Sequence, residues 1–286
     1  MTCMNFSKMN RDDFMNLNKF ENISFLSFSI FKNKPLIAAV STRSGGVSSG
    51  RFSSLNMKFL EGEKSENVVE NRKRFLKVFD ISYKNIIACD QVHGTEIKTV
   101  TGKDKGKGAL SPNSCFHGYD GLITNELNVP LTMCFADCTP IFLYDKVNNV
   151  IALCHAGWRG TVGNITGKAV DIMKTDFGTN PENIVAGIGP AIGQDSFEVG
   201  KEVYEEFLKI FDKNEMNLIS YEGNNGKYFI NLEKANELLL VKSKVNSKNI
   251  ECADFCTKTH SDILYSYRKD NGKTGRHMAV FMLKNR

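Results

Sequence analysis

The stretch "NNVIALCHAGWRGTVGNITGKAVDIMKTDFG", residues 148–178, places an apolar strand, a glycine-rich turn and a helix in one segment. Its first part, "NNVIALC", has the length and composition of a buried strand. Its last part has the apolar spacing of a helix that begins near Gly163 and ends at Gly178. Between them, "HAGWRG" carries a histidine, the only tryptophan and an arginine. A strand that ends in this way indicates either an unusual turn or a chemical site.

The rest of the chain predicts more strands and a few helices. The segments with strand patterns are "PLIAAVSTR", "NIIACDQVHGTEIKTV" with a turn at His93, "VPLTMCFADCTPIFLYD" with a break at residues 137–140, "NIVAGIG", and a C-terminal strand pair within residues 253–283. Helical spacing occurs in "SENVVENRKRFLKVF", "KEVYEEFLKIF" and "NLEKANELLLVKSKV". No repeat or linker divides the chain. We therefore expect one α+β domain over residues 21–286, preceded by a loose or helical leader of residues 1–20.

Composition favours an ordinary globular protein. The apolar fraction of 41% and the charged fraction of 24% allow a sizeable core. The net charge of +5 comes from scattered residues, so we expect a solvated basic surface and no nucleic-acid partner. The cysteine spacing matches no disulfide module, and neither a signal peptide nor an apolar run of about 20 residues is present. We expect a cytoplasmic protein without a membrane partner.

Three residues lie where an apolar strand meets a loop, namely His93, Cys138 and His155. A catalytic zinc site uses three protein ligands, often cysteine and histidine, and leaves a fourth position open. Side chains from different strands can converge at one mouth of a β-rich scaffold, so these residues are candidate metal ligands. The same residue types also suit a thiol nucleophile, Cys138, with His155 as its base. The sequence leaves both interpretations open.

Glycine-containing loops carry four arginines that could bind an anion. A guanidinium can bind phosphate or carboxylate through two parallel hydrogen bonds. The N-terminal N–H groups of the helix after "GWRGT" would add a further anion site. For any single arginine an ordinary surface charge is the better explanation, and this explanation is weakest for the arginine of "GWRG". The four residues are Arg43, Arg159, Arg268 and Arg276.

Spacing excludes two common motifs. "GNITGKA", residues 163–169, has three residues between its glycines where a Walker motif needs four, and Ala169 follows Lys168. The zinc-deaminase pattern H-x-E is absent, because Thr95 stands two residues after His93.

A set of motifs resembles a known family from about residue 37 to the C-terminus. They occur in the order found in the YfiH-like family, also called the multicopper polyphenol oxidase or laccase domain. They are "STRSGGVSSGRFSSLN", "DQVHGTEI", "DGLIT", "ADCTP", "CHAGWRGT", "GIGPAIG", "FEVG" and "SYRKDNGKTGR". The resemblance implies a mixed β-sandwich flanked by helices. It also implies an enzyme that cleaves adenosine, inosine and methylthioadenosine with phosphate, and that deaminates adenosine.

The resemblance also implies a ligand set. The family binds zinc through the histidine of "QVHG", the cysteine of "ADC" and the histidine of "HAGWRG", which are His93, Cys138 and His155 here. It further covers Arg43 and Arg159. A multicopper laccase needs a histidine-rich trinuclear centre, and five histidines without a His-x-His pair do not supply one. Copper is expected only as a substitute ion in the three-ligand site.

The resulting hypothesis is a zinc-dependent purine nucleoside phosphorylase. Phosphate, held by Arg43 and Arg159, would attack the ribose C1′ while the base leaves. Zinc would polarise a substrate oxygen or activate a water. Asp137 would carry a proton or orient a ligand. Arg268 and Arg276 complete the candidate anion-binding residues.

Two departures from the family pattern concern substrate preference rather than reaction class. They are the segments Gln194-Asp195-Ser196 and Arg268-Lys269-Asp270-Asn271. Two rival functions stay open at this point. One is a metal-free cysteine hydrolase that uses Cys138 and His155 on cell-wall peptides, and the other is a nucleoside-binding regulator without turnover. The sequence predicts no oligomeric state.

Overall fold

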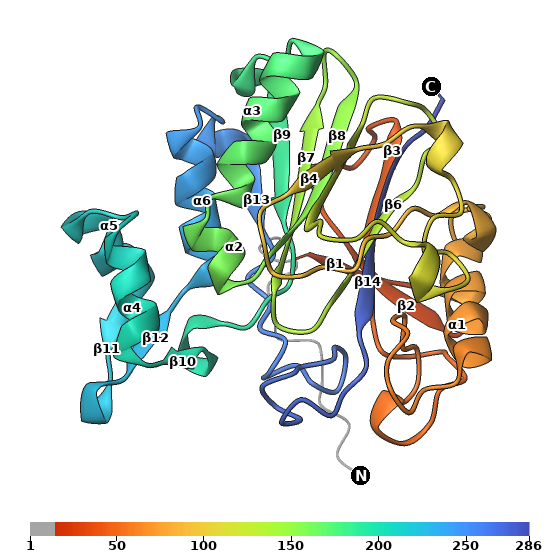
Figure 1. The fold of residues 1–286 in the computed structure, drawn as a ribbon, viewed down its shortest axis with the longest axis horizontal. Coiled ribbons are helices and arrows are strands. Elements are labelled where there is room, and N and C mark those ends of the chain that lie inside the picture. The colour runs from red at the N-terminus through yellow and green to blue at the C-terminus, as the bar shows by residue number, and fades with distance from the viewer. Residues whose placement is uncertain (1–14, 286) are drawn as a thin grey trace.

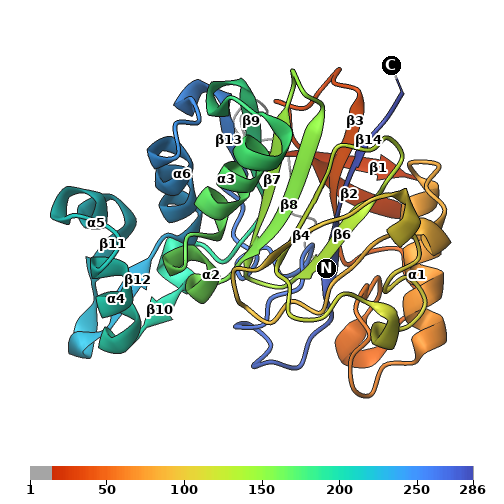
Figure 2. The same cartoon turned by 45° about the horizontal axis from the view of Figure 1, so that its top comes forward.

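Two β-sheets form the body of the protein in the computed structural model, which describes residues 15–285 (Figures 1 and 2). The first sheet has five strands, each antiparallel to its neighbours. In spatial order these are β1 (Asn16–Phe20), β2 (Ile23–Ser27), β3 (Leu36–Ser41), β14 (His277–Leu283) and β6 (Leu131–Phe135). The second sheet has six strands and is parallel only at its two edge pairs. In order these are β13 (Ile250–Cys252), β9 (Ile184–Ile188), β7 (Thr139–Asp145), β8 (Val150–Ala156), β5 (Gly121–Thr124) and β4 (Ile97–Thr99).

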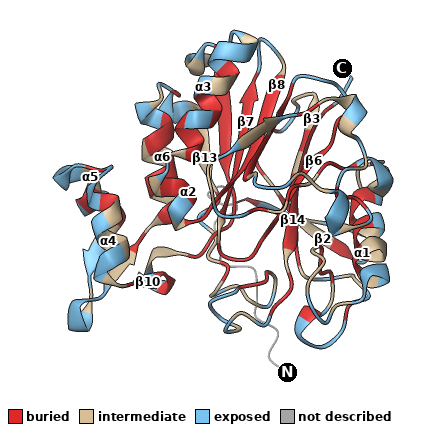
Figure 3. Cartoon of the chain, viewed as in Figure 1, coloured by how far each residue is buried: buried red, intermediate tan, exposed pale blue. Residues whose placement is uncertain are grey.

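The two sheets pack face to face around the main apolar core. Val40 of β3 and Phe281 of β14 belong to one buried cluster with Phe142 of β7 and Leu153 of β8. The rings of Phe142 and Phe281 meet edge to face, with centres 5.2 Å apart. Every residue of β7 and β8 is buried (Figure 3). Burial on both faces explains why these strands read as continuous apolar runs rather than as an alternating pattern.

Helices cover the outer faces of both sheets. Helix α1 (Ser65–Lys77) buries Phe75 and Leu76 in the cluster that covers the outer face of the first sheet. Helices α3 (Ile165–Phe177) and α6 (Leu232–Lys242) cover the second sheet, through side chains such as Met173 and Leu240. These layers confirm the expected α+β class and the β-sandwich flanked by helices. The predicted bounds of α3 are confirmed, with Gly178 as its left-handed C-cap.

A smaller lobe projects from the side of the second sheet (Figure 1). It has its own apolar core, which includes Phe207 and Ile219, and which also contains Leu239 of α6. The short helix α2 (Trp158–Val162) directly follows β8, and Trp158 packs against this core. The lobe contains β10 (Glu198–Val199), α4 (Lys201–Leu208), α5 (Lys213–Ile219), β11 (Ser220–Glu222) and β12 (Tyr228–Ile230).

The boundary of the predicted leader is wrong. Residues 16–20 form β1, which pairs with β2 at the edge of the first sheet, and residues 1–14 lie outside the described residues. Pairing with β2 makes a strand of a segment whose isolated Met and Phe residues carry no clear pattern. No helix among residues 15–285 has both the length and the apolar character needed to cross a bilayer.

Two further expectations about strands are wrong. The segment before His93 makes only isolated bridges, Ile87 with Leu131 and Cys89 with Phe116, and the strand of that region is β4. The expected C-terminal strand pair contains one strand, β14, preceded by turns and one isolated bridge at Cys256. The reason is that β14 pairs with β3 on one side and β6 on the other, so the preceding segment has no free edge to join.

His277, the first residue of β14, is fully buried without a polar partner. Neither of its ring nitrogens has a hydrogen-bond partner among the described residues. Its ring stacks on that of Phe135, the opposite residue of β6, with ring centres 6.3 Å apart. Burial, together with the charge of Arg276, lowers the pKa of His277 to about 3. The folded protein therefore keeps this histidine neutral at pH values where the unfolded chain protonates it.

This difference predicts acid sensitivity. Below about pH 6.5 the unfolded chain binds a proton that the folded chain excludes, so each unit of falling pH favours unfolding by about 1.4 kcal/mol, down to about pH 3. His277→Leu removes the proton site and keeps an apolar side chain. Urea unfolding between about pH 6.5 and 4.5 should show a shallower loss of stability in His277→Leu than in the wild type, by about that slope. Equal slopes would show that folded His277 is protonated.

Candidate metal centre and its cavity

A cavity of about 370 Å³ opens at the adjoining ends of β7 and β8. Its volume is in the range of sites for small organic ligands. Its walls come from the sandwich, from the lobe through Phe197, and from the segment that leads into β14. All but one of the predicted site residues line it. These are His93, Asp137, Cys138, His155, Arg159, Arg268 and Arg276.

The pairing of β7 with β8 brings Cys138 and His155 together. Thr139, at the start of β7, pairs with Ala156 at the end of β8. One step further, this register places Cys138 opposite Gly157. Because side chains alternate along a strand, Cys138 and His155 project toward the same face, although they are distant in sequence.

Cys154 lies on the other face of β8, as its alternation with His155 predicts. It is fully buried in the apolar cluster beneath α3. Burial, followed by the charge of Asp120, raises the pKa of the Cys154 thiol to about 12. Cys154 is therefore a core residue and not part of the cavity.

Gly157 lies against the side chains of Cys138 and His93, where a larger residue would crowd them. A Cβ atom at this position would lie 3.1 Å from Sγ of Cys138 and 3.2 Å from Cδ2 of His93. Its φ of −74° is open to any residue. The close packing of these two side chains favours glycine here, and the backbone conformation does not demand it.

The buried carboxylate of Asp120 fixes both histidines. Its Oδ1 accepts a hydrogen bond from Nδ1 of His155 at 2.8 Å and from the backbone N–H of His93 at 3.0 Å. Its Oδ2 accepts from the N–H groups of Gly94 at 2.7 Å and Val92 at 3.2 Å. Because Nδ1 of His155 donates to Asp120, Nε2 is left as the nitrogen available to a ligand in the cavity.

Asp120 is held in its charged form. Burial alone would raise its pKa, but the hydrogen bond and charge of His155 and the N–H groups of Gly94 and His93 outweigh burial and lower it. The backbone of His93 has a φ of +64°, in the left-handed region that non-glycine residues rarely adopt. The N–H groups bound to Asp120 hold the loop in this shape, and strained backbone of this kind clusters at functional sites.

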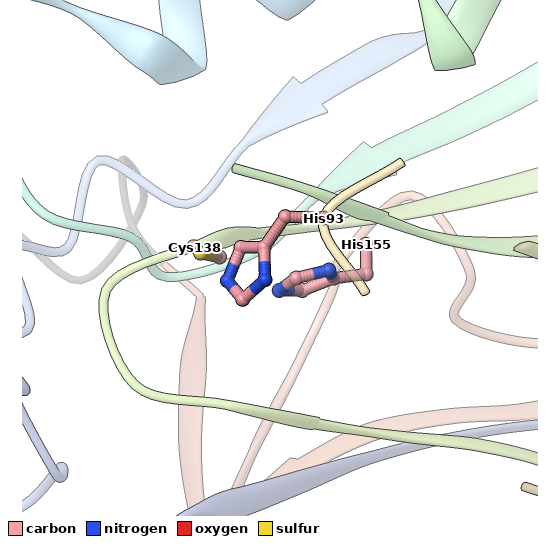
Figure 4. A group of neighbouring side chains, drawn as sticks. All are labelled: His93, Cys138 and His155. Atoms are coloured by element: carbon pink, nitrogen blue, oxygen red, sulfur yellow. The ribbon is translucent and has the colours of Figure 1, made fainter. Parts of the chain in front are cut away.

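The three predicted donors converge (Figure 4). Sγ of Cys138 and one ring nitrogen each of His93 and His155 all lie within 4.8 Å of one another. Within residues 15–285, no other group of three His, Cys, Asp or Glu residues meets this criterion. Zinc bonds of about 2.0–2.3 Å need a somewhat closer set. His93 is exposed and lies on a loop, so rotation of its ring can close the difference. The donor set fits a metal ion that prefers nitrogen and sulfur ligands.

Cys138 and His155 stabilise each other's charged forms. Burial disfavours the thiolate, but the charge and hydrogen bond of His155 and a hydrogen bond from His93 outweigh it and lower the pKa of Cys138. Burial likewise opposes the charge on His155, but interactions with Cys138 and Asp120 raise its pKa. The thiolate is the form of cysteine that binds a metal ion or acts as a nucleophile.

Three arginines contribute positive charge to the cavity. Arg159 is exposed, and its guanidinium lies 4.2 Å from the centre of the Trp158 ring; no described residue hydrogen-bonds to it. Arg268 is also exposed, and its Nη1 donates to the carbonyl of Glu198 at 2.9 Å. Arg276, the third, is half-buried.

Asp137 ties two segments together beneath the cavity. Its Oδ1 accepts a hydrogen bond from the hydroxyl of Thr257, and its Oδ2 accepts one from the backbone N–H of Arg268, both at 2.6 Å. Its φ of +87° lies outside the usual range for a non-glycine residue. With both oxygens engaged, Asp137 is placed to position the Arg268 segment.

Arg43 is the predicted site residue that does not line the cavity. Its Nε and Nη2 donate to the carbonyl of Ser53 at 3.1 and 3.0 Å, and its Nη1 donates to that of Ser261 at 2.6 Å. The guanidinium also lies 4.8 Å from the centre of the Tyr265 ring. Its donors hold two loops together, so this geometry favours a supporting role over a direct contact with phosphate.

Sequence reasoning missed Asp120, Gln91 and Lys58. Asp120 had a signal, because it is a carboxylate placed directly before the buried strand of "DGLIT". Gln91 donates to the carbonyl of Cys134 and accepts from its N–H, at 2.7 and 2.9 Å, which ties the His93 loop to β6. Lys58 lines the cavity, but its sequence surroundings contain no signal.

The family described as multi-copper polyphenol oxidoreductase laccase matches residues 37–284. The chain is 35% identical over 252 residues to a protein named purine nucleoside phosphorylase YlmD from Bacillus subtilis, covering 88% of this chain and 90% of that protein. It is 36% identical over 245 residues to one named purine nucleoside phosphorylase from Bacteroides thetaiotaomicron, covering 85% and 90%.

Solved structures agree with this match. The fold superposes on YlmD from Geobacillus stearothermophilus with a TM-score of 0.90 and 33% identity, covering 96% of this chain and all of that one. It superposes on the hypothetical protein YfiH of Bacillus licheniformis with a TM-score of 0.88 and 30% identity, covering 94% and 99%.

Replacement of Asp120 should weaken metal binding. Asp120→Asn keeps the shape of the side chain but removes the charge that orients His155 and the His93 loop. We expect zinc affinity to fall by about 10- to 100-fold, the usual effect of losing a carboxylate behind a histidine ligand. Competition with a chromophoric chelator measures it, and Asp171→Asn on the exposed face of α3 is the control. Unchanged affinity would contradict the role of Asp120.

Gly157→Ala should also weaken metal binding, through crowding. The new methyl group would press on Cys138 and His93, and we expect a loss of zinc affinity of at least about 10-fold. Gly102→Ala is a matched control, because its methyl group would approach only a side-chain oxygen of Glu126. If the two variants bind zinc equally well, Gly157 does not set the space between the donors.

Proposed function

The chain belongs to the multi-copper polyphenol oxidoreductase laccase family, and on this premise we propose that it is a zinc-dependent purine nucleoside phosphorylase. The names of its relatives support a phosphorylase. The observation that carries the proposal is that one cavity holds the His93, Cys138 and His155 donors together with three arginines. Such a cavity suits a reaction between a neutral nucleoside and a phosphate anion.

The proposed substrates are adenosine, inosine and methylthioadenosine. An oxygen of phosphate attacks C1′ of the ribose, the bond from C1′ to the base nitrogen breaks, and the base leaves with the bonding electrons and takes up a proton. The products are the free base and ribose 1-phosphate, or its methylthio analogue. Positive charge from Arg159, Arg268 and Arg276 offsets the charge of phosphate in the transition state.

His93, Cys138 and His155 would hold the zinc ion. When bound, zinc would act as a Lewis acid that polarises a substrate oxygen. The protein's part is to orient the donors, which Asp120 does for both histidines. Copper is a substitute that this donor set would also accept.

Two predicted residues take supporting roles in this proposal. Asp137 positions Arg268 by accepting its backbone N–H, and Arg43 braces the loops of Ser53 and Ser261. Adenosine deamination is a second proposed activity of the same cavity, and it needs water in place of phosphate.

A second candidate function has one observation in its favour. Despite burial, His155 lowers the pKa of the Cys138 thiol, as a catalytic base does for a thiol nucleophile. A metal-free cysteine hydrolase acting on cell-wall peptides would use such a pair. Elemental analysis of the purified protein separates the two functions. One zinc per chain, with Cys138 as a ligand, excludes a free thiolate nucleophile.

Incubation of the protein with inosine or adenosine and phosphate should yield ribose 1-phosphate and free base. Cys138→Ala should reduce the rate by roughly 100-fold or more, because even the loss of a residue behind a metal ligand costs about 10- to 100-fold. Cys252→Ala, at a half-buried cysteine outside the cavity, should keep the rate.

The proposal fails if zinc-loaded protein forms no phosphate-dependent product and Cys138→Ala behaves like the wild type. Tight inosine binding without product would instead support a nucleoside-binding regulator. Formation of inosine from adenosine without phosphate tests the deaminase activity separately.

A further inference from the structure

We propose that Lys58 and Arg276, held side by side by Asn56, form the subsite that binds the phosphate co-substrate. The inference rests on the proposed function and names which cations of the cavity contact the anion. Lys58 did not stand out in the sequence, and Asn56 lies outside the cavity.

Lys58 is a half-buried lysine in the cavity wall without an acidic partner. Its Nζ donates to the backbone carbonyl of Asp90 at 3.1 Å. No carboxylate within residues 15–285 forms an ion pair with it. An ammonium group has three N–H donors, so two remain for a ligand. A lysine whose role was only to solubilise the surface would extend into water instead of lining a cavity.

The guanidinium of Arg276 also has N–H donors without a partner among the described residues. Its Nη1 donates to the carbonyls of Thr274 and Gly275, each at 2.9 Å, and its guanidinium lies 5.4 Å from the centre of the Tyr267 ring. No described residue accepts from its Nε or Nη2. These contacts fix the direction of the guanidinium and leave donors for an anion.

Asn56 explains why these two residues, far apart in sequence, lie together. It is fully buried, and its Oδ1 accepts hydrogen bonds from the backbone N–H groups of Arg276 at 2.9 Å and Lys58 at 3.3 Å. Its Nδ2 donates to the carbonyl of Lys58 at 2.9 Å. The N–H of Met57 adds a bond of 2.9 Å to the carbonyl of Arg276. One amide side chain thus fixes the backbones of both cations.

The surrounding charges favour an anion between them. Asp137 is the one carboxylate among the described residues that line the cavity, and Thr257 and Arg268 already engage its two oxygens. Glu63, which accepts from Nδ2 of Asn56 at 3.2 Å, does not line the cavity.

Exposure separates this pair from the other cavity cations. Arg159 and Arg268 are exposed, whereas Lys58 and Arg276 are half-buried, where less water screens their charge. A nucleoside is uncharged at neutral pH, so phosphate is the only anionic reactant. The partly buried pair is therefore the subsite for the reacting phosphate.

The test is the steady-state kinetics of Lys58→Met, which keeps the methylene chain and removes the charge. The apparent KM for inorganic phosphate at saturating inosine should rise by roughly 10- to 100-fold, the effect of one charge-assisted hydrogen bond. The KM for inosine at saturating phosphate should change by less than about twofold. Lys58→Arg, which keeps a cation, should recover most of the phosphate affinity.

Lys105→Met is the matched control, because it removes the same charge from an exposed lysine that lines no described cavity. It should leave both KM values unchanged. The subsite is refuted if Lys58→Met leaves the KM for phosphate unchanged, or raises the KM for inosine as much as that for phosphate. Circular dichroism and thermal unfolding of the variants check that both fold.

Calorimetric titration with inorganic phosphate alone separates this inference from the proposed function. Phosphate binding that Lys58→Met abolishes supports the subsite, even if inosine is never cleaved and the phosphorylase proposal fails. Phosphorolysis in which neither phosphate binding nor the KM for phosphate depends on Lys58 refutes the subsite and leaves the function standing.

Discussion

The carboxylate of Asp120 is the group on which the geometry of the candidate metal centre depends. It binds the ring of His155 and the backbone of the His93 loop at the same time. Asp120 directly precedes β5, β5 pairs with β8, and β8 pairs with β7, whose start adjoins Cys138. One set of hydrogen-bonded strands therefore fixes two donors, and a single buried anion attaches the third, which lies on a loop. Side chains at the ends of packed strands are held more precisely than side chains on loops.

Elements with long apolar patterns could be predicted from the sequence, and those that depend on distant partners could not. Strands β7 and β8 are buried on both faces, so their composition alone identifies them. Helix α3 has a periodic face and a glycine at its end. By contrast, β1 is a strand because β2 lies beside it, and residues 253–276 form turns because both edges of β14 are occupied. Pairing is a property of the whole chain, which a local pattern does not contain.

The same limit applies to the site. His93, Cys138 and His155 were recognisable because reactive residue types stood at the ends of apolar strands, and the family resemblance selected the same three. Arg43 and Arg159 both lie near glycines, yet one braces two loops and the other lines the cavity. Composition around an arginine does not reveal what its guanidinium faces. The role of Asp120 depends on strand register, and that of Lys58 on an asparagine that joins two distant segments.

The separate core of the lobe affects how the sequence of this protein can evolve. Its apolar core is separate from that of the sandwich, and it contributes the cavity wall at Phe197. The metal donors and Asp120 belong to the strands of the sandwich and the loops at their ends. Substitutions in the lobe can therefore reshape one wall of the cavity without direct contact with the metal donors or Asp120. The fold separates one wall of the cavity from the strands and loops that carry the donors, so selection can alter one while preserving the other.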